Sequence, residues 1–192
     1  MLHVSGRVDL NYHNLFNILL HHLEVPAAFI PGSLILSGAA WWLAPRRGWD
    51  RTPAMLAGCS LALVLALTVV RPSGHFPGGG LNPLMTLRLC TVGSFSLAHI
   101  YEQLNVALFV PFAVFGTLAI RRPALVAISC ALVSVVAEFM QGTTGGGECQ
   151  VRDIAHNALG GVLGALLAMA VLRLRARRTP DIKAEVGAGS AR

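Results

Sequence analysis

Five long apolar segments constrain this chain more than any other feature of its sequence. They cover residues 25–44, 54–70, 104–120, 123–141 and 153–172. Each has about the 17–25 residues that an α-helix needs to cross about 30 Å of hydrocarbon. A helix satisfies its own backbone hydrogen bonds, which lipid cannot do. The sequence therefore predicts an all-α membrane helix bundle, with five transmembrane helices in one transmembrane domain over residues 25–172.

The amino-acid composition is that of a membrane protein rather than a soluble one. Of the 192 residues, 54% are hydrophobic and 12% are charged, whereas soluble domains carry about 25% charged residues. The net charge of +6 would favour nucleic-acid binding in a soluble protein. Here the basic residues lie mainly between and beyond the apolar segments. We therefore expect the lipid bilayer as a partner, and no nucleic acid.

Arginine and lysine are distributed unequally between the two sides that five spans define. The side with residues 1–24, 71–103 and 142–152 holds four arginines, whereas the other side holds eleven basic residues. Because basic loops stay in the cytoplasm, we expect the N-terminus outside and the C-terminus inside. Residues 1–24 form an extracytoplasmic segment whose apolar spacing suits a helix along the membrane interface. Residues 173–192 form a basic cytoplasmic tail that we expect to be disordered.

Polar side chains from three spans arrive at the same level of the membrane in this topology. The third span brings Asn105 to the outer surface, preceded by Glu102 and Gln103, and the fourth span ends there with Glu138 and Gln141. The fifth span starts there. The candidate site combines seven residues, either as a ligand-binding cluster or as a structural lock between helices: Asn105, Glu138, Gln141, Arg152, Asp153, His156 and Asn157.

Helical spacing places the unusual residues of the fourth and fifth spans on two stripes. The stripe of the fourth span contains Cys130, Ser134, Glu138 and Gln141. The stripe of the fifth span contains Asp153, Asn157, Gly160 or Gly161, Gly164 and Ala168. We expect the two stripes to face each other, because a Gly-xxx-Gly step permits close helix approach. In the third span, Pro111 lacks a backbone donor and should kink the helix.

Glu138 is a carboxylate about one helical turn below the expected outer surface. A charge at the centre of a bilayer costs at least about 2.5–3.5 kcal/mol, and less near the interface. Glu138 should therefore face protein or water and have a partner. Arg152 is the nearest candidate cation in the outer loop, and His156 or Asn157 is a candidate hydrogen-bond donor.

The four cysteines divide into two pairs by position. Cys90 and Cys149 both fall on the outer side, where a disulfide is permitted. Cys59 and Cys130 lie within spans and are interpreted as packed thiols. Because the chain contains no CxxC pair and no zinc-ligand spacing, we predict neither a metal site nor a cofactor.

Three motifs in the second half of the chain resemble those of the VanZ-like family of bacterial membrane proteins. The first is "NVALFVPF", with Asn105, Pro111 and Phe112, and the second is "EFMQ" at 138–141. The third is "DIAHNALGGVLG" at 153–164, which carries Asp153, Asn157, Gly160 and Gly164. Upstream, "LNPLMTL" at 81–87 is similar to a further family stretch. The resemblance covers about residues 81–170, and the order and spacing of the motifs make it specific.

One position departs from the family pattern. The family usually carries an Arg some six residues before the Asp, where this chain has Gly147. Arg152, directly before Asp153, is the candidate to take over that role. The resemblance implies a multi-pass protein of the bacterial plasma membrane. The founding member of the family is associated with resistance to teicoplanin, a glycopeptide that acts on cell-wall precursors outside the membrane.

The functional reading is therefore a cell-envelope role, such as glycopeptide tolerance by binding or shielding a surface or lipid-linked ligand at the outer leaflet. A membrane enzyme acting on such a lipid is an alternative, with Glu138, Asp153 and His156 as acid–base groups. No HExxH or serine-nucleophile motif supports it, and no catalytic residue is assigned. A small transporter is another alternative, although it would place polar groups near the middle of the membrane.

Overall fold

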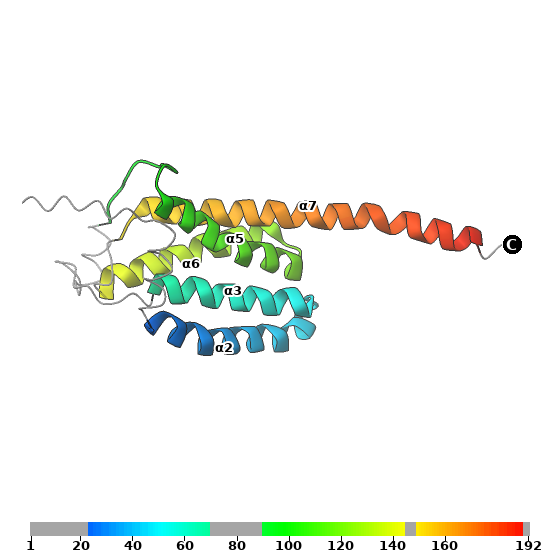
Figure 1. Cartoon of the computed structure of the whole chain (residues 1–192), viewed down its shortest axis with the longest axis horizontal. Coiled ribbons are helices and arrows are strands. Elements are labelled where there is room, and N and C mark those ends of the chain that lie inside the picture. The colour runs from blue at the N-terminus through cyan, green and yellow to red at the C-terminus, as the bar shows by residue number, and fades with distance from the viewer. Residues whose placement is uncertain (1–22, 70–89, 145–148, 190–192) are drawn as a thin grey trace, which may run out of the picture.

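The computed structural model describes residues 23–69, 90–144 and 149–189, with side chains of the last helix placed as far as residue 177 (Figure 1). Five helices occupy these ranges: α2 (Glu24–Arg47), α3 (Arg51–Val69), α5 (Ile100–Ile120), α6 (Pro123–Thr144) and α7 (Val151–Gly189). Each is long and apolar enough to cross a membrane, and the described residues form no strand, only an isolated bridge between Thr91 and Gln150. The predicted all-α bundle with five spans is confirmed.

Successive helices run in opposite directions, so the bundle has two ends (Figure 1). The disulfide end carries the starts of α2, α5 and α7 and the ends of α3 and α6, and it holds the Cys90–Cys149 disulfide. The arginine end carries the turns from α2 to α3 and from α5 to α6. It is rich in arginines from both turns: Arg46, Arg47, Arg51, Arg121 and Arg122.

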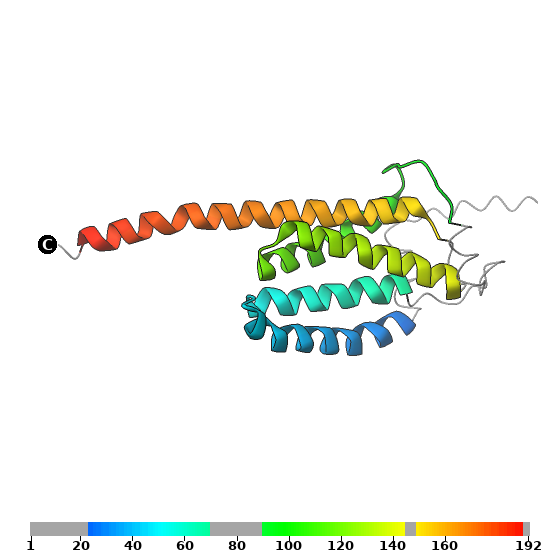
Figure 2. The ribbon, with the colours of Figure 1, turned by 180° about the vertical axis from the view of Figure 1, so that it is seen from behind.

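The helices pack in an order that places α7 at one side of the bundle and α2 at the other. α7 lies along α5 and α6, α3 packs on α5, and α2 packs on α3. Figure 2 shows the same order from behind. An apolar core fills the space between α3, α5 and α6: Val64, Phe109, Ala113, Val126 and Cys130. Large apolar side chains such as Leu34, Leu132 and Leu167 point outward, as a lipid-facing surface requires.

The turns at the arginine end are set by two residues with left-handed backbone. Gly48, with φ 68°, ends α2 and donates its N–H to the carbonyls of Ala44 and Pro45. Arg121, with φ 55°, ends α5 and donates to the carbonyl of Thr117. A glycine adopts this conformation without strain, whereas an arginine does not. α5 itself continues through Pro111 as one helix, and the kink expected there stays a prediction.

The close approaches of α7 agree with the expected contact to the α6 stripe at Gly161 but differ from it at Gly160 and Gly164. A Cβ on Gly164 would lie 2.6 Å from the Val110 carbonyl oxygen of α5, and one on Gly160 would collide with the carbonyl of Val106. A Cβ on Gly161 would instead lie 2.6 Å from Cys130 Cβ of α6. The Gly160–Gly164 step therefore packs on α5 and not on α6. Helix α7 contacts both helices, and neighbouring residues of α7, such as Gly160 and Gly161, face different ones.

The tail after residue 172 also differs from the prediction. We expected disorder over residues 173–192, but the helix α7 continues to Gly189 (Figure 1). The segment opens with Arg, Leu and Ala residues, which have high helix propensity. Extending an existing helix adds one hydrogen bond per residue without a new nucleation cost. The predicted interfacial helix within residues 1–24 and the motif at 81–87 lie almost wholly outside the described residues.

Candidate polar site at the disulfide end

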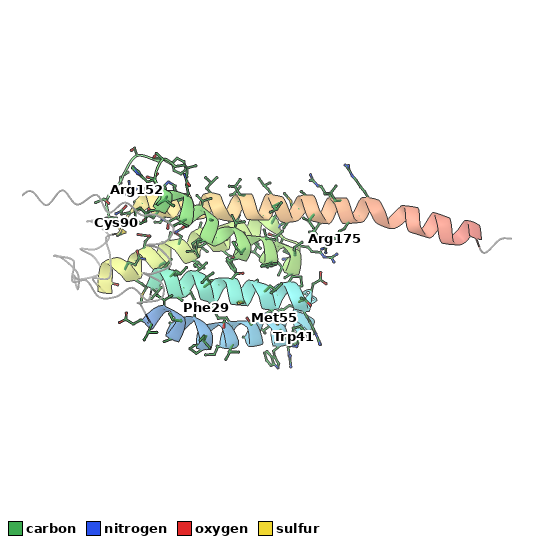
Figure 3. The ribbon with its side chains drawn as sticks, viewed as in Figure 1. Phe29, Trp41, Met55, Cys90, Arg152 and Arg175 are labelled. Atoms are coloured by element: carbon green, nitrogen blue, oxygen red, sulfur yellow. A yellow bond between two sulfur atoms is a disulfide. The ribbon has the colours of Figure 1, made fainter. Side chains whose placement is uncertain are left out.

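The segment Cys90–His99, which precedes α5, is fastened to the start of α7. Cys90 and Cys149 form a disulfide with an S–S distance of 2.01 Å, so the cysteine pairing considered from the sequence is confirmed. Beside it, Thr91 N–H donates to the Cys149 carbonyl at 2.9 Å, and Val151 N–H donates to the Thr91 carbonyl at 3.1 Å. Figure 3 shows Cys90 and Arg152 at this end of the molecule.

Glu102 is a buried carboxylate in the first turn of α5, with a side chain that is 5% exposed. Its Oε2 accepts the backbone N–H of His99 at 3.1 Å. Glu102 thus satisfies an N–H at the start of the helix, as a glutamate three residues after an N-cap residue can do. Its Oε1 lies 3.8 Å from Nη1 of Arg152, which brings the start of α5 to the start of α7.

Arg152 connects several groups at this end. Its Nε donates to Gln150 Oε1 at 3.0 Å and lies 3.9 Å from Asp153 Oδ1. Its ion pairs within the described ranges are with Glu102 of α5 and with Asp153 of α7, whereas the sequence offered it as a candidate partner of Glu138. Helix α7 packs more extensively against α5 than against α6. The Arg152 side chain remains 38% exposed.

Glu138 is held by the backbone before α7. Its side chain is buried at 5% exposure, and its Oε2 accepts the N–H of Gln150 at 3.0 Å. A hydrogen bond from a backbone N–H to a carboxylate is stronger than one between neutral groups, which offsets part of the cost of burial. Glu138 therefore ties α6 to the residue that follows the disulfide.

Gln141 and Asn157 lie in contacts between helices. Gln141 Nε2 donates to the Thr68 carbonyl in the last turn of α3, where a helix has carbonyls without internal partners. Asn157 Nδ2 donates to Ser134 Oγ at 2.9 Å, and both residues are buried. This bond confirms that the α6 stripe faces Asn157 of α7. Asn157 Oδ1 has no hydrogen-bond partner among the described residues.

His156 is fully buried beneath the segment that precedes α5. Its Nε2 lies 2.7 Å from the carbonyl oxygen of Ser96, and the Phe95 ring lies 4.7 Å from its ring, between centroids. Because a carbonyl only accepts, Nε2 carries the hydrogen, and Nδ1 of a neutral ring is then an acceptor. Within the described ranges, that Nδ1 has no hydrogen-bond partner, and Asp153 Oδ1, another acceptor, lies 3.8 Å away.

The seven residues of the predicted site therefore divide into groups. Arg152, Asp153 and His156 come together, and with Glu102 they form what we call the polar site. Glu138 reaches it through Gln150, whereas Gln141 and Asn157 bond elsewhere. Asn105 is half-buried on α5 and is not a member of the polar site.

Glu102, Ser96 and Gln150 take part in the site although the candidate residues chosen from the sequence did not include them. The predicted third span began at 104, whereas α5 begins at Ile100, so Glu102 was placed beside the span rather than in its first turn. A glutamate just before an apolar run was the signal available. Ser96 and Gln150 act largely through backbone atoms, which a residue pattern does not reveal. Within the described ranges, no group of three His, Cys, Asp or Glu side chains is arranged to hold a metal ion.

Comparison with known proteins identifies one family. A family model described as VanZ/LLP1 matches residues 59–173, which is more than half of the chain. The match contains every residue of the polar site and the disulfide. Searches of curated proteins and of solved structures found no match.

Proposed function

Because this chain belongs to the VanZ/LLP1 family, we propose that it is a bacterial plasma-membrane protein that binds a surface or lipid-linked ligand of the cell envelope at its polar site. Five membrane-spanning helices make it a multi-pass protein. Bound or shielded in this way, a cell-wall precursor would be less accessible to a glycopeptide such as teicoplanin, so the proposed outcome is glycopeptide tolerance.

Two independent features support an orientation with the disulfide end outside. Disulfides persist in oxidising compartments and are rare in the cytoplasm, which favours an external Cys90–Cys149 pair. Basic residues flank spans on the cytoplasmic side, and the opposite end of the bundle carries the arginines of both turns, such as Arg46 and Arg121. The polar site would then lie at the level of the outer leaflet.

The observation that carries the proposal is that the buried His156 Nδ1 faces Asp153 Oδ1, because in a neutral ring both atoms are acceptors. If the polar site only held helices together, we would expect each of its buried polar atoms to have a hydrogen-bond partner, because a buried polar atom without one reduces stability by about 1–3 kcal/mol. Here a buried Nδ1 has no donor among the residues that the structure describes, and it faces a carboxylate oxygen 3.8 Å away. A ligand amine, which carries more than one N–H, can donate to both atoms. The Asp153 side chain is 26% exposed, so such a ligand can reach it from the surface.

Glycopeptide tolerance tests this role. We expect the Asp153→Asn variant, expressed in a teicoplanin-sensitive bacterium, to accumulate in the membrane like the wild type and to give no more tolerance than cells without the protein. The amide keeps the size of the carboxylate but replaces one acceptor oxygen by a donor. The measurements are the teicoplanin concentration that stops growth and the amount of protein in isolated membranes.

Glu24→Gln is the matched control, because Glu24 is an exposed carboxylate at the same end of the bundle and outside the polar site. It should leave tolerance intact. Full tolerance with Asp153→Asn at normal abundance would show that the polar site does not bind the relevant ligand.

A further inference from the structure

A second candidate site lies at the arginine end, far from the polar site along the bundle. A cavity of about 240 Å³ opens between the residues that begin α3, the end of α5 and the face of α7. Its lining includes the apolar side chains of Leu118 and Leu172. The charged groups of the lining are Asp50, Arg121 and Arg175, two guanidinium groups and one carboxylate. The cavity therefore combines basic groups with apolar side chains.

Aromatic residues place this cavity at the level of lipid headgroups. Trp41 and Trp42 are exposed near the end of α2, and tryptophans concentrate at membrane–water interfaces. Arg46 lies 3.7 Å from the centre of the Trp42 ring, so a cation accompanies the aromatic surface. Figure 3 shows Trp41 and Arg175 toward the same end of the bundle.

The backbone of Arg121 gives an independent reason to regard its side chain as functional. Its φ of 55° is left-handed, a conformation that glycine or asparagine adopts at the end of a helix with less strain. An arginine there is less favourable for the backbone than glycine, which is consistent with a role for its side chain. Arg121 Nη2 donates to Asp50 Oδ2 at 3.2 Å, which orients the guanidinium. A guanidinium has five N–H donors, so Arg121 can bond Asp50 and a ligand at the same time.

We propose that this cavity binds the phosphate of an anionic phospholipid, with Arg121 and Arg175 contacting the phosphate oxygens. Guanidinium groups match phosphate geometry, and their planar fork favours two parallel hydrogen bonds. The apolar side chains of Leu118 and Leu172 would contact the glycerol and the first acyl carbons. A soluble phosphate would gain nothing from those side chains. The inference depends neither on the polar site nor on which leaflet the arginine end faces.

Lipid binding to the purified full-length protein tests the inference. The protein is placed in detergent with phosphatidylcholine or phosphatidylglycerol, and bound lipid is counted by native mass spectrometry. We expect phosphatidylglycerol to bind preferentially. Each arginine near a membrane surface contributes roughly fivefold to binding an anionic lipid. The double variant Arg121→Gln, Arg175→Gln should therefore lose about 25-fold in that preference.

Arg177→Gln is the matched control, because it removes the same charge from the same helix at a residue that does not line the cavity. It should keep the preference. Arg121→Lys, which keeps the charge, guards against misfolding and should lose less than Arg121→Gln. Equal losses in Arg177→Gln and Arg175→Gln would overturn the site. Glycerol 3-phosphate competing as well as phosphatidylglycerol would overturn the lipid as its ligand.

Discussion

Single carboxylates at the disulfide end differ in how completely they are satisfied. Glu102 accepts a backbone N–H and lies near Arg152, and Glu138 accepts a backbone N–H as well. Within the described residues, the contacts of the Asp153 carboxylate are longer, 3.9 Å to Arg152 Nε and 3.8 Å to His156 Nδ1. The first two therefore act as structural groups, and Asp153 is the carboxylate that keeps capacity for another molecule.

This difference predicts opposite effects on stability. Asp153→Asn should leave the thermal midpoint of the detergent-solubilised protein unchanged or higher, because its amide can donate to His156 Nδ1. Glu102→Gln should lower the free energy of unfolding by about 1–3 kcal/mol, because a buried acceptor of a charged partner is weakened. A thermal scan of both variants gives the comparison. A large loss in Asp153→Asn together with no loss in Glu102→Gln would reverse the two roles.

Residue patterns predicted some of these contacts and not others. Helical spacing was enough to place Asn157 opposite the α6 stripe, where it bonds Ser134. The partner of Arg152 could not be predicted, because its choice between Glu102 and Glu138 depends on how α7 sits between α5 and α6. The environment of His156 Nδ1 could not be predicted either. It depends on the bond between His156 Nε2 and the backbone carbonyl of Ser96, which lies far away in the sequence.

Helix α7 owes its position to residues that lack side chains. Gly160 and Gly164 allow the backbone of α5 to approach, and Gly161 accommodates Cys130 of α6. In a bilayer, such close packing supplies much of the attraction between helices. Lipid tails are as apolar as the side chains, so the hydrophobic effect does not drive helices together there. The polar site depends on this packing, because Glu102 comes from α5 and the other three residues come from α7.

Bulk at this contact should therefore separate the helices. A Cβ on Gly164 would lie 2.7 Å from Ala113 Cβ as well as close to Val110, so Gly164→Val should destabilise the protein by about 1–3 kcal/mol through overpacking. The thermal midpoint measured by loss of the monodisperse peak in detergent reports the effect. Gly38→Val is the control, because a Cβ there meets nothing within 4 Å. Comparable losses at both glycines would show that helix propensity, and not packing, governs the result.

Over the whole molecule, hydropathy was sufficient to predict all five helices, because length and apolarity alone decide whether a segment can span a bilayer. Boundaries were less predictable: α5 begins at Ile100 rather than 104, and α7 continues to Gly189. Polar residues and good helix formers can extend a helix beyond the apolar segment. A prediction based on hydropathy identifies only the apolar segment and therefore misses these ends. The order in which the helices pack also depends on shape, which the apolar pattern does not encode.

Orientation is the prediction that belongs to this scale. Ser94 is exposed at the disulfide end, and Arg177 is exposed on α7 beyond the arginine end. A cysteine at residue 94 should react with a membrane-impermeant maleimide in intact cells, whereas a cysteine at residue 177 should react only after lysis. Labelling of the wild type, in which Cys130 is buried and Cys59 is partly buried, provides the background. The reverse pattern would place the polar site in the cytoplasm.

The bond between Cys90 and Cys149 makes the covering of His156 depend on the redox state of its surroundings. Reduction would remove the covalent link between the segment Cys90–His99 and the start of α7, and only noncovalent contacts, such as the hydrogen bonds of Thr91 and Ser96, would then hold the two together. With the proposed orientation, the thiol chemistry outside the cell would therefore set how firmly the polar site is covered.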